Sequence, residues 1–206
     1  VSSETLAIAA SYAGIKKSAL LVTKVNNDAE RITQYITEKA ITDVTVIGAI
    51  DSNIIAAIQG LGKNISTITG NSVFELSNNV AQNLDVTTGK KYVLANLNNP
   101  SQIAIATSLA VRTKRALLLT GNGLMNLETA QFLVGIEEPD VIVVGTTDDI
   151  SNAAMASVEN AKRLDTSDLG EASLNSLYQN QDTTRGLVVM GDETPVWKSL
   201  LLAATG

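Results

Sequence analysis

The amino-acid sequence predicts an α/β fold made of tandem repeats, in which each repeat is a parallel β-sheet with helices on both faces. Three observations lead to this prediction. The 206-residue chain matches itself when it is shifted by 97 residues, short apolar segments alternate with helical patterns, and 45% of the residues are hydrophobic while only 3% are aromatic. Short segments that are apolar on both faces and separated by helices are typical of parallel sheets, so we expect Rossmann-like units with an aliphatic core.

The internal repeat is the clearest feature of the sequence. Residues 4–61 align with residues 101–158 without a gap, and 18 of the 58 aligned positions are identical, which indicates a duplication. The strongest pairs are "KSALLVT" (17–23) with "KRALLLT" (114–120) and "DVTVIGAID" (43–51) with "DVIVVGTTD" (140–148). Further along, "YVLANLNNP" (92–100) aligns with "LVVMGDETP" (187–195).

This alignment divides the chain into units. Residues 1–88 are expected to form a first unit that lacks its opening strand, and residues 89–184 a complete second unit. Residues 185–206 are either the start of a third unit or a strand that completes the first. We therefore expect the chain to be a segment of a longer tandem-repeat protein.

The second unit shows the expected order of elements most fully. Pro100 suits the first turn of a helix, and Gly121 and Gly123 close the apolar run "ALLLT". We expect strands at 92–97, 116–120, 140–145 and 163–167, and helices at 100–111, 126–135, 147–161 and 168–177. In the first unit, residues 19–23 are expected to form the same central strand as residues 116–120. The basic residues before both strands lie where the preceding helix ends, and the helix dipole favours cations there.

Composition excludes several classes of function. The chain contains neither Cys nor His, which excludes disulfides, thiolate sites, imidazole-based triads and the commonest zinc sites. Its net charge of −6 argues against nucleic acid as a partner, and no apolar run is long enough to span a membrane. Asn, Thr and Ser dominate the polar residues, as in exported surface proteins. We therefore expect no cofactor, no metal, no catalytic residues and no enzyme.

A few acidic residues remain as candidates for a ligand site. Asp51 and Asp148 occupy equivalent positions after a predicted strand, and Asp149 is adjacent. Such residues are also common helix N-caps, which we favour. The alternative is a Rossmann-like small-ligand binder or enzyme that uses the cleft between the two units, lined by these residues and the loop at 120–123.

The order of the motifs resembles the cell-wall-binding type 2 repeat, which occurs in tandem in surface-layer and autolysin-type proteins of Gram-positive bacteria. "LAIAAS…SALLVT" and "IAIATS…RALLLT" match the part of the repeat that ends in "PiLL", and "DVTVIG" and "DVIVVG" match its glycine-ended strand. "STITGNSVFELS" and "KRLDTSDLGEAS" fall where the family has an Arg-Gly-Arg-Tyr stretch. Two departures are that Ala19 and Ala116 replace the proline and that the "dRyeT" signature is missing.

The resemblance implies toprim-like α/β modules that bind an anionic wall polymer near the "PiLL" strand. It implies a secreted, cell-surface protein: a non-catalytic module that anchors or assembles a surface-layer type protein, with the polymer, neighbouring surface-layer subunits and further repeats as partners. Carried over by position, the polymer-binding residues are Lys17, Ala19, Leu20, Leu21, Val22, Lys114, Arg115, Ala116, Leu117, Leu118 and Leu119.

Overall fold

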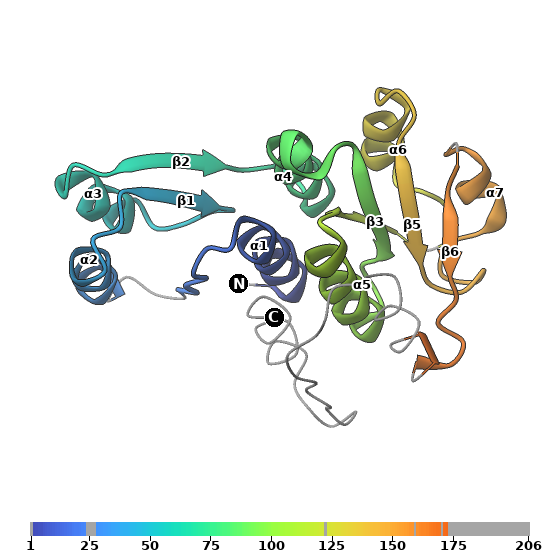
Figure 1. The fold of residues 1–206 in the computed structure, drawn as a ribbon, viewed down its shortest axis with the longest axis horizontal. Coiled ribbons are helices and arrows are strands. Elements are labelled where there is room, and N and C mark those ends of the chain that lie inside the picture. The colour runs from blue at the N-terminus through green and yellow to red at the C-terminus, as the bar shows by residue number, and fades with distance from the viewer. Residues whose placement is uncertain (1, 24–27, 122, 159, 170, 173–206) are drawn as a thin grey trace.

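The computed structural model describes residues 2–23, 28–121, 123–158, 160–169 and 171–172. Two parallel sheets lie toward opposite ends of an elongated molecule, with helices between them (Figure 1). The four-stranded sheet has the order β4-β3-β5-β6 and the other sheet pairs β1 with β2. The strands are β1 (Asp43–Ile47), β2 (Asn64–Ile68), β3 (Lys91–Asn96), β4 (Ala116–Thr120), β5 (Asp140–Val144) and β6 (Lys162–Leu164). The predicted class, α/β with parallel sheets flanked by helices, is confirmed.

Most of the described helices begin where the sequence offers a side-chain cap, and α2 (Ala29–Glu38) is the exception. Ser2, Ser72 and Asn99 each accept a hydrogen bond from a backbone N–H three residues later, and Pro100 occupies the first turn of its helix as expected. The helices are α1 (Ser3–Lys16), α2 (Ala29–Glu38), α3 (Ser52–Gly60), α4 (Val73–Thr88), α5 (Pro100–Thr113), α6 (Leu127–Val134) and α7 (Asn152–Ala156). The predicted last helix and the C-terminal segment lie largely or wholly outside the described residues.

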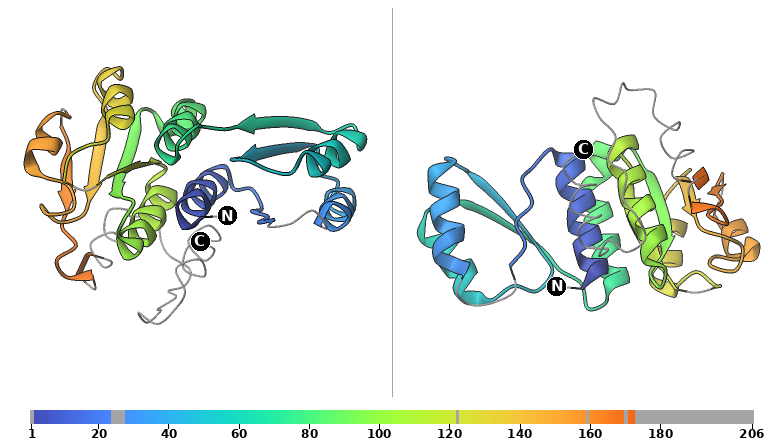
Figure 2. Two further views of the ribbon diagram at one scale, coloured as in Figure 1. Left: turned by 180° about the vertical axis from the view of Figure 1, so that it is seen from behind. Right: turned by 90° about the horizontal axis from the view of Figure 1, so that it is seen from below.

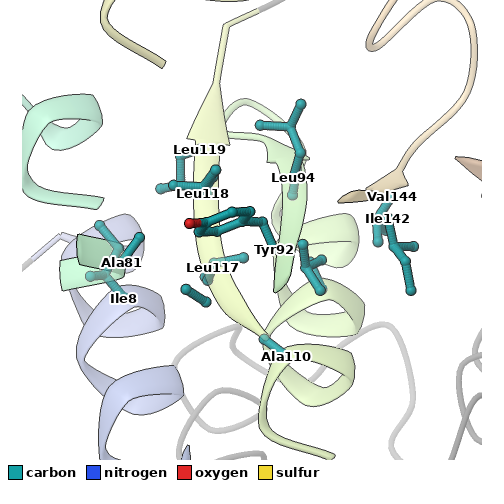
Figure 3. Close-up of a cluster of buried hydrophobic side chains, with 14 of the residues drawn as sticks. Ile8, Ala81, Tyr92, Leu94, Ala110, Leu117, Leu118, Leu119, Ile142 and Val144 are labelled. Atoms are coloured by element: carbon teal, nitrogen blue, oxygen red, sulfur yellow. The ribbon is translucent and has the colours of Figure 1, made fainter. Parts of the chain in front are cut away.

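The main core surrounds the four-stranded sheet and draws on helices from both repeats. The interiors of β3, β4 and β5 are almost completely buried, as expected for strands covered on both faces. α1 and α4, which come from the first repeat by sequence, contribute Ile8 and Ala81 to this core (Figure 3). The Tyr92 hydroxyl on β3 donates a 2.7 Å hydrogen bond to the Asp85 carboxylate on α4, which ties this helix to the sheet.

The two-stranded sheet has a smaller core of its own. Ile32 and Ile36 from α2 pack with Ile54 and Ile58 from α3, and residues of β1 and β2 complete the cluster. Of the five residues of β1, only Val46 is fully buried, whereas four of the five in the equivalent strand β5 are. The first repeat is therefore less enclosed than the second.

The prediction of a central strand at residues 19–23 is wrong. The structure has no strand there, and the Leu21 and Val22 side chains are 49% and 38% exposed, while the equivalent Leu118 and Leu119 are fully buried. The described residues offer this segment no partner strand. Among the described strands, β4 pairs only with β3, and the described part of the first repeat contains no strand equivalent to β3. A segment with no backbone partner cannot form a sheet.

The two repeats meet where α1 packs against α5 (Figure 2). Gly14 of α1 and Val111 of α5 are equivalent positions in the two copies and face each other at this contact. A Cβ atom added to Gly14 would lie 2.6 and 2.7 Å from the two γ-methyl groups of Val111. The close approach of the helices therefore requires that one copy lack a side chain where the other carries a branched one.

The predicted limits of the repeat units, at residues 88 and 184, stay a prediction.

We expect Gly14→Ala to lower the free energy of unfolding by about 1–3 kcal/mol, because the new methyl group overpacks the contact with Val111. Urea denaturation measures the change. Gly60→Ala is the matched control, because a Cβ at Gly60 on α3 meets nothing within 4 Å. This control should be neutral or stabilising by less than about 1 kcal/mol.

The double variant Gly14→Ala/Val111→Ala removes both γ-methyl groups and should recover part of the loss, so the two changes will not be additive. If Gly14→Ala were as harmless as Gly60→Ala, the helix contact would not be as close as the structure shows.

Candidate functional site

Polar side chains converge at the carboxyl edge of the four-stranded sheet. Gln102 of α5 donates from Nε2 to the Asp149 carboxylate at 2.6 Å and to the Thr166 hydroxyl at 2.9 Å. The same Asp149 oxygen accepts from the backbone N–H and the hydroxyl of Thr146, at 2.9 and 2.6 Å. The Asn96 side-chain amide at the end of β3 donates to the Asp149 carbonyl. The network thus joins the loops that follow β3 and β5, the point at which α/β sheets commonly bind ligands.

The network holds Asp149 in its charged form. Partial burial raises the pKa of this carboxyl, but the hydrogen bonds from Thr146 and Gln102 lower it by more, so the pKa lies below its ordinary value. Sequence reasoning missed Gln102, which is only 2% exposed and whose Oε1 has no hydrogen-bond partner. The available signal was a glutamine within the otherwise apolar helix "SQIAIATSLAV".

The other acidic candidates have local roles. Asp51 caps α3 by accepting a 2.8 Å hydrogen bond from the Asn53 N–H, as favoured from the sequence. The cap expected of Asp148 and Asp149 is wrong, because Ser151 caps α7; Asp148 is exposed beside the network. In the predicted loop at 120–123, Gly123 is bound through its backbone to Asp149 and Ser151. Asp51 and Asp148 follow strands of separate sheets, and the described residues contain no group of three or more acidic side chains that could hold a metal ion.

The opposite, amino edge of the same sheet is basic. Because all four strands are parallel, the residues before and at their starts share this edge. Exposed lysines stand at or just before the starts of β3, β4 and β6, and Arg115 directly precedes β4. The lysines are Lys90, Lys91, Lys114 and Lys162.

Asp140 at the start of β5 is the acidic partner of Arg115 at this edge, and the exposed Glu137 and Glu138 precede the same strand. Arg115 donates to the Asp140 carboxylate at 2.7 Å and to the Asp140 backbone carbonyl at 2.9 Å. The Arg115 hydrogen bond holds the pKa of Asp140 below its usual value despite partial desolvation, and the charges of Arg115, Lys162 and Lys91 lower it further. Lys91 and Lys162 therefore lie close enough to Asp140 for their charges to act on it. Sequence reasoning selected Lys114 and Arg115 but missed these two lysines, which belong to other strands.

The remaining residues that were predicted to bind the polymer differ in how exposed they are. Ala116, Leu117, Leu118 and Leu119 are fully buried in β4, and Thr120 at the end of the strand is buried as well, so no side chain of this strand is exposed. Lys17 and Lys114 occupy equivalent left-handed positions at the ends of α1 and α5. Ala19, Leu21 and Val22 are exposed, and Leu20 is partly buried against the main core. The role of these residues in polymer binding stays a prediction.

We expect the Arg115–Asp140 pair to contribute to stability only above acidic pH. Because the folded-state pKa of Asp140 is lowered, its contribution is complete above the unfolded pKa of about 3.9 and disappears as the pH falls through the lower folded value. The Asp140 side chain is 43% exposed, so solvent screening limits the gain to about 1 kcal/mol or less. Urea denaturation of the parent and Asp140→Asn should differ at pH 6, and the difference should shrink as the pH falls below the unfolded pKa of about 3.9. A difference that did not shrink as the pH fell further would contradict the assigned pKa direction.

Comparisons with known proteins place this geometry in context. No protein-family model matches the chain. The chain is 29% identical over 151 residues to the N-acetylmuramoyl-L-alanine amidase LytC of Bacillus subtilis (strain 168), a match that covers 72% of this chain and 30% of the amidase. Two solved structures from Clostridium difficile share the fold. Cwp6 matches with a TM-score of 0.76 and 16% identity, and the match covers 98% of this chain and 34% of Cwp6. Cwp8 matches with a TM-score of 0.68 and 15% identity, and the match covers 85% of this chain and 31% of Cwp8.

The chain thus spans about a third of the length of each of these proteins. The similarity to LytC contradicts the prediction that the chain is not an enzyme, because it relates the chain to part of an amidase. The lack of His and Cys excludes imidazole and thiolate chemistry within these 206 residues, but it does not separate the chain from an enzyme family. No helix in the described part of the chain is long and apolar enough to cross a membrane.

Proposed function

We propose that the chain is a cell-envelope module that holds a longer protein at the bacterial cell surface by binding an anionic wall polymer, and that it belongs to the cell-wall-binding type 2 repeats. The observation that carries this proposal is the basic amino edge of the four-stranded sheet. Four exposed lysines and Arg115 gather there although the chain as a whole carries a net charge of −6. Because the whole chain is acidic, its net charge would not attract an anionic polymer. Any such attraction has to come from the local cluster of cations at this edge.

Arg115 and the lysines have different roles at this edge. The Arg115 guanidinium is already bound to Asp140 and only 13% exposed, so it holds the starts of β4 and β5 together. The lysines are the groups free to meet a polymer, except that Lys90 also donates a 3.3 Å hydrogen bond to the Glu137 carbonyl. Their charges lie at the ends of flexible stems, which suits a repeating anionic chain better than a small rigid ligand. Several weak contacts along one polymer would add through multivalency.

The similarity to an amidase fits the same proposal. The name of that relative states that it acts at N-acetylmuramoyl-L-alanine, a linkage of the bacterial wall, and the chain matches only 30% of its length. A segment that binds the wall would keep an attached amidase beside its substrate. The proposal therefore includes a longer protein that is itself an enzyme.

We expect the double variant Lys91→Glu/Lys162→Glu to bind purified Gram-positive walls at least about tenfold more weakly than the parent, since each charge near an anionic surface contributes about 1 kcal/mol. Cosedimentation at low salt measures the affinity, and added salt should weaken the parent's binding. The matched control is Arg31→Glu/Lys39→Glu, which makes the same charge change at exposed positions on and next to α2.

The parent should also lose binding to walls from which the anionic polymer has been extracted. Equal losses in both double variants would show that only net charge matters, and undiminished binding in the first would remove the basic edge as the site.

A further inference from the structure

At the amino edge of the four-stranded sheet, three cations surround one carboxylate. Lys91 of β3 is the register partner of Asp140 of β5, and Lys162 of β6 pairs with the residue two positions after Asp140. Arg115 directly precedes β4, and the β3–β4 register, extended by one residue, places it opposite Lys91. Opposed residues, and residues two positions apart on one strand, point to the same face of a sheet. The three cations and Asp140 therefore lie on one face.

Arg115 reaches this carboxylate across the intervening strand. β3 lies between β4 and β5, so the long Arg115 side chain spans about 9.6 Å. Its Nη2 donates to the Asp140 carboxylate at 2.7 Å and its Nη1 to the Asp140 backbone carbonyl at 2.9 Å, while the buried Nε has no hydrogen-bond partner among the described residues. Because one bond goes to the backbone, the guanidinium keeps its place if the carboxylate leaves. Its Nε and Nη2 could then donate together to an oxyanion, the geometry that arginine favours.

The two lysines act on the same carboxylate. The hydrogen bond from Arg115 lowers the pKa of Asp140 most, and the charges of Arg115, Lys162 and Lys91 lower it further, while desolvation opposes them. The Asp140 side chain is nevertheless 43% exposed, so solvent reaches it. A carboxylate that three cations surround at an open edge occupies the position that an anionic ligand would take.

The equivalent carboxylate in the first repeat has neutral partners. Asp43 begins β1 as Asp140 begins β5. It accepts hydrogen bonds from the Thr42 hydroxyl and from the Asn64 side-chain amide, the latter at 3.0 Å. These bonds lower the pKa of Asp43. An aspartate at this position therefore stays charged with neutral partners alone.

The cations are a feature of the second repeat. The 97-residue alignment places Ser18 at the position of Arg115, and the strand pairing places Ser66 at the position of Lys162. Both serines are exposed. The second repeat thus carries more positive charge at this edge than its aspartate requires, and the excess points to an anion from outside the chain.

We propose that these three cations form a binding site for one oxyanion of the wall polymer, and that the Asp140 carboxylate fills this site until the polymer displaces it. The inference rests on the proposed function and adds a competitor to it. A tethered carboxylate competes at a high effective concentration, so a small free anion displaces it poorly. A polymer gains further contacts from the exposed Lys90 and Lys114 beside the site and can displace it. The site therefore selects polyanions over small anions.

Asp140→Asn removes the competing charge and should bind purified Gram-positive walls about fivefold more tightly than the parent at low salt. Asp43→Asn is the matched control, because it makes the same change in net charge at the equivalent position of the first repeat, and it should bind like the parent. Cosedimentation measures the affinities, and urea denaturation at pH 6 checks that both variants are folded.

A gain confined to Asp140→Asn supports the oxyanion site. Equal gains in both variants would show that only net charge matters, and this would overturn the proposal. Unchanged or weaker binding by Asp140→Asn would overturn it as well, because the carboxylate would then not compete with the polymer.

Inorganic pyrophosphate separates this site from the proposed function. At constant ionic strength it should raise the melting temperature of Asp140→Asn by at least about 2 °C and that of the parent and Asp43→Asn by less, because only the first lacks the competing carboxylate. If the parent failed to bind walls, the attachment would be refuted, whereas this result would still support the oxyanion site. Equal shifts in all three proteins would overturn the site even where walls are bound.

Discussion

Backbone pairing to β3 is the interaction on which the four-stranded sheet depends. β3 lies between β4 and β5 and is the only described partner of β4, so it supplies the ladder that turns "ALLLT" into a buried strand. Residues 19–23 have almost the same sequence as β4 but are irregular, and the described part of their repeat contains no counterpart of β3. Nearly identical segments therefore differ in structure, so the local sequence alone does not decide whether a strand forms here.

This dependence explains which parts of the fold could be predicted from the sequence. The strands β3, β4 and β5 and the start of α5 at Pro100 were predictable, because apolar runs and turn residues mark them locally. The conformation of residues 19–23 was not predictable from their own sequence, because strand formation requires pairing with another segment. The candidate sites follow the same rule. Gln102 and Thr166 are 64 positions apart and Arg115 and Asp140 are 25 apart, and only the folded sheet brings them together.

The contact between α1 and α5 joins the first repeat to the main core. α1 buries most of its apolar residues, Ile8 among them, in the core that surrounds the four-stranded sheet. The glycine at position 14 and the valine at 111 show that the two copies have diverged in a complementary way at this contact. Two identical valine-bearing copies could not approach as closely. The duplication therefore produced a specific pair of helices and not two independent domains.

The same architecture assigns different chemistry to the two edges of the four-stranded sheet. At the carboxyl edge, where α/β proteins often bind ligands, Gln102, Asp149 and Thr146 satisfy one another and hold the loops in place. At the amino edge, Arg115 is bound to Asp140 and the neighbouring lysines are exposed. A parallel sheet gathers the starts of all its strands at one edge, so scattered basic residues in the sequence become one surface. The arrangement of strands, more than any single motif, therefore creates the cationic edge that the proposed attachment to the cell envelope requires.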